Sequence, residues 1–151
     1  MEDVRNIAKW FLSRQPMTHK KLQKLCYYAQ AWYCTLYDGT PLFEDEIQAW
    51  VHGPVVPTLF RIYADAKWND IPQIDDFDED TLPEKVLDVL RAVQNTYGDF
   101  DGDQLEILTH REDPWINARG SCKPLEPCTN VISCAAMREY YGRIYAQSQG
   151  E

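Results

Sequence analysis

The sequence predicts a mainly α protein of about seven helices with one small antiparallel β-hairpin or sheet, folded as a single compact domain. In residues 22–36, apolar side chains recur at steps of three and four, the spacing of one helical face. Residues 47–52 instead alternate apolar and polar side chains, which is the period of a half-buried strand. Six further segments carry helical spacing or capping residues. We therefore expect the helix that contains residues 22–36 to be the spine of the domain.

The length and composition fit one domain. A chain of 151 residues with 44% hydrophobic and 13% aromatic residues can bury a core, which should be rich in Trp and Tyr. We expect a single domain over residues 1–151.

Two helices are predicted before the sheet. Asp3 can cap a first helix that ends before Pro16 and carries one apolar face. The long helix then runs from near Thr18 to Asp38 and Gly39, because Gly can adopt the positive φ that closes a helix.

The small sheet is predicted next. Residues 41–43 should begin it, residues 44–46 form an acidic turn, and residues 47–52 form the clearest strand. Gly53 and Pro54 are expected to end that strand. Helices must cover the apolar face of the hairpin, because a lone hairpin is barely stable.

Two helices should follow the sheet, separated by a loop. The first begins near Pro57, where a proline is tolerated in the first turn. The acidic residues 69–80 lack helical period and should form a surface loop. Thr81 and Glu84 have the spacing of a capping box, for a helix that ends at Gly98.

Three more helices are predicted after residue 100. Asp101 can cap a helix over residues 105–110, and a short helical turn follows over residues 114–120. Thr129 or Asn130 is expected to cap the last helix.

The charge and the N-terminal sequence restrict the function. With 24 acidic and 15 basic residues the net charge is −9, which favours basic partners and makes direct nucleic-acid binding unexpected. Neither a long apolar segment nor a secretory signal is present, so we expect a cytoplasmic protein that does not enter a membrane. Five cysteines without a secretory signal are expected to be reduced thiols.

Neither a metal nor a cofactor is expected. Asp99, Asp101 and Asp103 match the start of a calcium loop, but Gln104 replaces the required Gly and His110 replaces the final Glu. Cysteines 122, 128 and 134 are spaced six residues apart, unlike the close Cys pairs of common zinc sites.

We also expect no enzymatic activity. Nucleophilic catalysis would need Cys26 or Cys34 beside His52 or His110, and Cys26 lies in an apolar stripe, where thiols are usually inert. No phosphate loop or nucleophile elbow is present. A dispersed site that gathers His52, His110 and a cysteine beneath the sheet remains the alternative.

Four residues are candidates for binding a partner. Lys20 and Lys24 lie near the start of the long helix, where the dipole disfavours cations. The preferred interpretation of these lysines is a solvated face, and the alternative is a basic patch for a carboxylate or phosphate on a partner. Trp50 and His52 are expected on the polar face of the strand. An exposed Trp50 would suit a protein-binding contact.

Four segments together resemble the Panacea, or SocA-like antitoxin, domain of many bacteria and prophages. They are LQKLCYYAQAWY at 22–33, PLFEDEIQAWVHGPVVP at 41–57, LTH at 108–110 and PWINA at 114–118. Their order and spacing are specific, and the resemblance extends over nearly the entire chain. The positions that recur in the family are Gln30, Trp50, His52, Gly53, Pro54, His110 and Trp115. For His110 and Trp115, capping and core packing are preferred over ligand contact.

The resemblance implies the antitoxin of a type II toxin–antitoxin system, which neutralises a cognate protein toxin by direct binding. The toxin would be encoded by an adjacent gene. At least one member of the family delivers its toxin to a cytosolic protease, so a proteolysis adaptor is an alternative, and other members are known only as phage-associated proteins. Many members carry an accessory DNA-binding segment before the domain, for which this chain has no room, so we do not expect direct transcriptional autoregulation. The resemblance supplies no catalytic residues.

Overall fold

The computed structural model describes residues 1–150, and its mainly α architecture confirms the predicted fold class. Within these residues there are seven α-helices and two small antiparallel sheets of two strands each. In chain order the elements are α1 (Val4–Leu12), β1 (Met17–Thr18), α2 (His19–Leu36), β2 (Gln48–Trp50), β3 (Gly53–Val55), α3 (Pro57–Tyr63), the 3-10 turn η1 (Ala64–Ala66), β4 (Asp70–Ile71), the 3-10 turn η2 (Glu79–Thr81), α4 (Glu84–Tyr97), α5 (Gly102–Thr109), α6 (Asp113–Arg119) and α7 (Cys134–Gln149).

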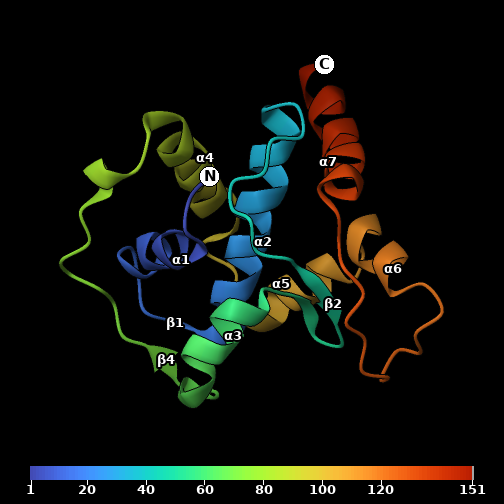
Figure 1. Cartoon of the computed structure of the whole chain (residues 1–151), viewed down its shortest axis with the longest axis horizontal. Coiled ribbons are helices and arrows are strands. Elements are labelled where there is room, and N and C mark those ends of the chain that lie inside the picture. Colours follow the sequence, from blue (N-terminus) through green and yellow to red (C-terminus); the bar gives the residue numbers. More distant parts are fainter. Residues whose placement is uncertain (151) are drawn as a thin grey trace.

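Helix α2 runs through the middle of the molecule, with α1 and α4 on one side and α7 on the other (Figure 1). It also packs against α5 and β3, so that 14 of its 18 residues are buried. Its first turn is capped by Thr18, whose Oγ1 accepts a hydrogen bond from the Lys21 amide at 3.2 Å. The prediction that this helix is the spine of the domain is confirmed.

Buried glutamines of α2 bind the backbone of neighbouring segments. The Gln30 amide donates to the Phe43 carbonyl at 2.8 Å and accepts from the Leu42 amide at 2.6 Å. Gln23 accepts from the Val56 amide at 2.7 Å and donates to the Val56 carbonyl at 3.2 Å. Since buried polar groups are costly when unpaired, these bonds fix the strand-like segments against the helix.

A buried carboxylate joins α2 to α7. Glu112 precedes α6 and accepts hydrogen bonds from the Tyr28 hydroxyl at 2.6 Å and the Tyr141 hydroxyl at 2.9 Å. Tyr28 also stacks on Tyr97 of α4, with ring centroids 3.9 Å apart. Burial raises the pKa of Glu112, although the two hydroxyl donors act to lower it.

The hairpin differs from the predicted one. Strands β2 and β3 pair with Trp50 opposite Gly53, so the turn lies at residues 51–52 and Gly53 begins the second strand instead of ending the first. Gly53 has a φ of +113°, which explains why the chain can turn back at this point. The other edge of β2 is bound by residues 130–132, where the Ala49 amide donates to the Asn130 carbonyl at 2.9 Å.

Residues 41–43 therefore do not belong to the hairpin, contrary to the prediction. Phe43 instead forms an isolated parallel bridge with Glu2, and the backbone of residues 42–43 is bound by Gln30. The second sheet, in which Met17 pairs with Ile71, was not predicted and lies partly in the expected loop 69–80.

Two of the predicted helix caps are confirmed, although α5 begins at Gly102 and not at residue 105. Asp3 caps α1, and Asp101 caps α5, where it forms a capping box with Gln104. The predicted capping box of Thr81 and Glu84 is wrong, because α4 begins after Pro83 without a side-chain cap.

The predicted cap of the last helix is also wrong. Ser133 caps α7 through a hydrogen bond from the Ala136 amide at 3.1 Å. Thr129 and Asn130 lie before it, in the segment that borders β2. Pairing with β2 keeps residues 130–132 extended, so the helix starts later than its apolar pattern predicts.

None of the helices in residues 1–150 combines the length and apolar character that crossing a bilayer requires.

Replacing Gly53 by Ala should lower the free energy of unfolding by about 1–3 kcal/mol, because a side chain would be strained at this φ. The new Cβ would also lie 2.7 Å from Lys24 Cε. Urea unfolding measures the loss. Gly142→Ala is the matched control: no atom lies within 4 Å of a Cβ there, and α7 should gain about 0.5–1 kcal/mol. Equal losses in the two variants would contradict this account of Gly53.

Glu112→Gln should make the protein more stable than the wild type at pH 8. This gain in the free energy of unfolding should be smaller at pH 4.5. The pKa of Glu112 is raised in the folded state, so its contribution is most favourable when it is protonated and is lost as the pH rises. Gln keeps an oxygen for both tyrosine hydroxyls. Glu112→Ala leaves the Tyr28 hydroxyl without its acceptor and the Tyr141 hydroxyl with Tyr27 alone, and should lose about 2–4 kcal/mol at either pH. Denaturant unfolding at the two pH values tests the difference between the variants.

Candidate functional site

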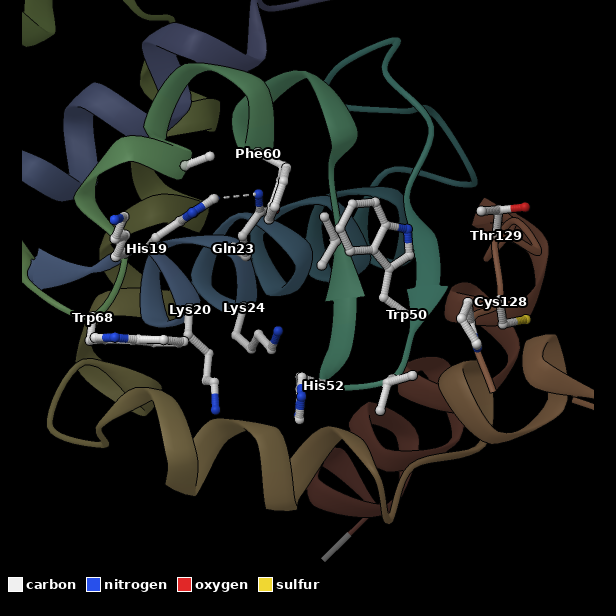
Figure 2. Close-up of a pocket in the computed structure, with 15 residues that line it drawn as sticks. His19, Lys20, Gln23, Lys24, Trp50, His52, Phe60, Trp68, Cys128 and Thr129 are labelled. Atoms are coloured by element: carbon white, nitrogen blue, oxygen red, sulfur yellow. Dashed lines mark hydrogen bonds between the residues drawn. The ribbon is translucent and has the colours of Figure 1, made fainter. Parts of the chain in front are cut away.

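A pocket of about 600 Å³ opens beside the start of α2, and all four residues predicted to bind a partner line it. Lys20 and Lys24 come from α2, whereas Trp50 and His52 come from the end of β2 and the hairpin turn (Figure 2). The remaining walls come from β3, α3, η1 and the residues 67–68 that follow it, and from residues 127–129. The structure thus brings together residues that are about thirty positions apart in the chain.

Lys24 is buried, which corrects the preferred interpretation of a solvated lysine face. Lys24 is only 1% exposed to solvent, and its Nζ donates one long hydrogen bond, of 3.4 Å, to the Pro54 carbonyl. Burial lowers the pKa of Lys24 to about 7, and the nearby Lys20 lowers it further while Glu106 opposes the shift. Within residues 1–150, no carboxylate forms an ion pair with this ammonium.

Lys20 and His52 share a carboxylate that the sequence analysis missed. Lys20 Nζ lies 2.6 Å from Glu106 Oε1 and 2.9 Å from Asp103 Oδ1, while His52 Nδ1 lies 3.0 Å from Glu106 Oε2. Burial alone would raise the pKa of Glu106, but the bonds from Lys20 and His52 lower it. Glu106 is more than fifty residues from both Lys20 and His52, and no local pattern marks it.

Aromatic side chains form the apolar part of the pocket. Trp50 packs against Phe60 with ring centroids 5.0 Å apart, and its Nε1 donates to Gln48 Oε1 at 2.8 Å. Phe60 is 40% exposed, and Trp68 is 89% exposed. Sequence analysis missed both, although a tryptophan at the edge of an acidic loop was a usable signal.

His19 forms part of the pocket wall in its neutral state. Its Nε2 lies 3.0 Å from Gln23 Nε2, and its ring packs against Phe60 with centroids 5.2 Å apart. Burial lowers the pKa of His19 to about 4, so at neutral pH the ring nitrogen can accept a hydrogen bond from the Gln23 amide.

Most of the family-motif positions support the pocket without lining it. Gly53 lies against Lys24, and Pro54 accepts the hydrogen bond from Lys24. Trp115 Nε1 donates to the Trp50 carbonyl at 2.8 Å, and its ring stacks on His110 at 3.9 Å. His110 is also the C-cap residue of α5, as the capping interpretation expects.

The cysteines considered as nucleophiles lie outside the pocket. Cys26 and Cys34 are buried in the core, and burial raises the pKa of the Cys26 thiol. Cys128 is the cysteine that lines the pocket, and its Sγ lies 2.8 Å from Cys122 Sγ. Among residues 1–150, no group of three His, Cys, Asp or Glu side chains is arranged to hold a metal ion.

Comparison with protein families identifies the domain. The family model described as "Antitoxin SocA-like, Panacea domain" matches residues 22–116, so the chain belongs to this family. The match runs from α2 into α6 and includes the hairpin, but it ends before residues 127–129 of the pocket wall. No curated protein and no solved structure matches the chain.

Lys24→Met should raise the free energy of unfolding by about 1–3 kcal/mol at pH 6, because a methionine avoids the cost of burying an ammonium. The pKa of Lys24 falls from 10.5 to about 7 on folding, so wild-type stability should rise between these pH values. The advantage of the variant should therefore shrink from pH 7 to pH 10. Denaturant unfolding across this range measures it, and a constant difference would contradict the lowered pKa.

Proposed function

We propose that this protein is an antitoxin that neutralises a cognate protein toxin by binding it directly through the pocket beside α2. Membership of the SocA-like antitoxin family gives the class of function. The observation that carries the proposed contact is the pocket itself, which Trp50, Phe60 and Trp68 line together with three lysines.

The exposed aromatic side chains favour a protein partner. Tryptophan contributes strongly to protein interfaces because it buries a large area with few rotatable bonds. Trp68 leaves 89% of its surface exposed and Phe60 leaves 40%, so both have area to bury on binding. A partner that covers the mouth of the pocket would bury both at once.

Charge supports the same proposal at longer range. The net charge of −9 would speed the approach of a toxin with a basic surface and would repel acidic competitors. Electrostatic attraction of this kind raises the association rate more than it raises the affinity.

We propose binding as the activity, without catalysis. Cys26 is buried with a raised pKa, which suits an inert side chain. His52 is held by the Glu106 carboxylate, and neither Cys26 nor Cys34 lines the pocket with it. These contacts are those of a structural hydrogen bond and a packed core.

Trp68→Ala should weaken toxin binding at least about tenfold, because it removes an exposed tryptophan from the contact. The product of the adjacent gene is expressed with and without this protein, growth is measured, and affinity is then determined on the purified pair. Trp68 is a better choice than Trp50, which packs on Phe60 and contributes to the fold.

Ile144→Ala is the matched control, because Ile144 is 37% exposed on α7 and does not line the pocket. It should leave growth and affinity unchanged. The proposal fails if the adjacent product is harmless alone or stays toxic beside the wild-type protein. If Trp68→Ala neutralises as well as the wild type, the toxin does not use this pocket.

A further inference from the structure

We propose that the pocket receives a carboxylate next to an apolar side chain, carried on a segment of the partner protein, and that Lys24 binds the carboxylate. This inference rests on the proposed function and adds the chemistry of the inserted segment. It reverses the expectation from net charge for this one site, because an acidic protein would here receive an acidic group.

The hydrogen-bonding capacity of Lys24 supports the assignment. An ammonium has three donors, and the structure gives this one a single long bond to the Pro54 carbonyl at 3.4 Å. The Lys24 side chain lines the pocket, although Lys24 is only 1% exposed to solvent. Figure 2 shows Lys24 between Lys20 and the hairpin residues Trp50 and His52, directed into the space they surround. A buried donor without sufficient acceptors is a strong site for a charged acceptor.

The charges around the pocket favour an anion. Its lining contains three lysines and two histidines and no Asp or Glu. The nearest carboxylates are already used: Glu106 binds Lys20 and His52, and Asp103 binds Lys20. Lys20 is thus neutralised by these neighbours. Of the other two lysines Lys67 is exposed, so Lys24 is the buried cation left to bind a ligand.

The aromatic walls define the rest of the ligand. Trp50, Phe60 and Val55 surround the approach to Lys24 with apolar surface. A volume of about 600 Å³ is large enough for more than one side chain. An acidic residue beside an aliphatic or aromatic one on the partner would fill both parts of the site.

Octanoate is the probe, because it joins a carboxylate to an apolar chain, and octan-1-ol is its uncharged control. At pH 6 we expect the dissociation constant of octanoate, measured by calorimetry, to be at least about tenfold lower than that of octan-1-ol. Lys24→Met should remove this difference, whereas Lys85→Met on α4, outside the pocket, should keep it. Unfolding midpoints confirm that both variants fold.

The pH dependence provides a second readout. The pKa of Lys24 is about 7, so octanoate binding should weaken about tenfold per unit above that value, while octan-1-ol binding stays constant. The other charged or titratable groups around Lys24 are His19 and Lys20 on α2, Glu106 on α5, His110 at its end, and His52 in the hairpin turn. Only a dependence that disappears in Lys24→Met supports the assignment to Lys24.

Three outcomes would overturn this inference. They are equal affinity for octanoate and octan-1-ol, octanoate binding that survives Lys24→Met, and octanoate binding that does not compete with the toxin. Each leaves the antitoxin proposal standing, because neutralisation and the effect of Trp68→Ala are measured without octanoate. Conversely, if Trp68→Ala binds the toxin as tightly as the wild type, the proposed toxin contact is wrong, and octanoate binding to the carboxylate site can still be measured.

A different observation supports a second site: we infer that Cys122 and Cys128 form a disulfide when exposed to a disulfide oxidant. Their Sγ atoms lie 2.8 Å apart, so only a small movement is needed to reach the bond length of about 2.05 Å. The intervening loop is held closed, because the Arg119 guanidinium donates to the carbonyls of Lys123 at 2.6 Å and Glu126 at 2.8 Å.

Oxidised glutathione is a sufficient oxidant. The Cys122 thiolate, the more exposed of the two, attacks one sulfur of oxidised glutathione and releases the first glutathione thiolate. The Cys128 thiolate then attacks Cys122 Sγ and releases the second. The two protons lost by the cysteines go to the two glutathione thiolates, so the protein is oxidised by two electrons and the oxidant is reduced by two.

Intact mass and peptide mapping test this site. After incubation with oxidised glutathione at pH 8.5, where more thiolate is present, the protein should lose two hydrogen atoms and yield a peptide linked between Cys122 and Cys128. Cys122→Ser should prevent this link without changing the unfolding midpoint. A stable glutathione adduct on Cys122, or a link between Cys34 and Cys134 instead, would overturn the inference.

Discussion

The burial of α2 on nearly every side is the constraint on which the rest of the structure depends. A buried helix is usually apolar, yet α2 carries two glutamines, two lysines, three tyrosines and a histidine at buried positions. Each of these groups needs a partner, because an unpaired buried polar atom costs free energy. Gln23 therefore fixes Val56, Gln30 fixes residues 42–43, and Tyr28 fixes Glu112. The order of the surrounding segments follows from bonds that start on one helix.

Lys24 is the exception that links this constraint to function. Its neighbours on α2 have short hydrogen bonds, but its ammonium has only the 3.4 Å contact with Pro54 and loses its charge near neutral pH. Gly53 allows the hairpin to approach this lysine, because any larger residue would collide with it. Stability and binding are therefore opposed at this position: the fold would be more stable with an apolar side chain, and the pocket would then lack its cation.

Local signals in the sequence were sufficient to predict the helices. The sequence did not predict the contacts between residues that are far apart in the chain. Asp3 and Asp101 were predicted as caps because each precedes an apolar helical pattern, and each caps a helix that begins at the next residue. The hairpin turn depends on the backbone conformation of Gly53. The wrongly predicted segments 41–43 and 69–80 depend on partners far along the chain, because Phe43 bridges Glu2 and Ile71 pairs with Met17. For the site, the four predicted residues meet in one pocket, but the burial of Lys24 is set by tertiary packing, which helical periodicity does not encode.

Some walls of the pocket also belong to the hydrophobic core, whereas one wall is a loop. The walls from α2 and the hairpin also hold the core, and except for His19 and Lys20 they lie within the segment shared with the family. Residues 127–129 lie beyond that segment and close the pocket from a loop between α6 and α7. This one wall can be replaced without altering α2 or the hairpin, so that a change of partner need not require a new fold. A recipient chain that kept α2 and β2–β3 but received a different 127–129 loop would inherit the binding chemistry and alter the shape it selects.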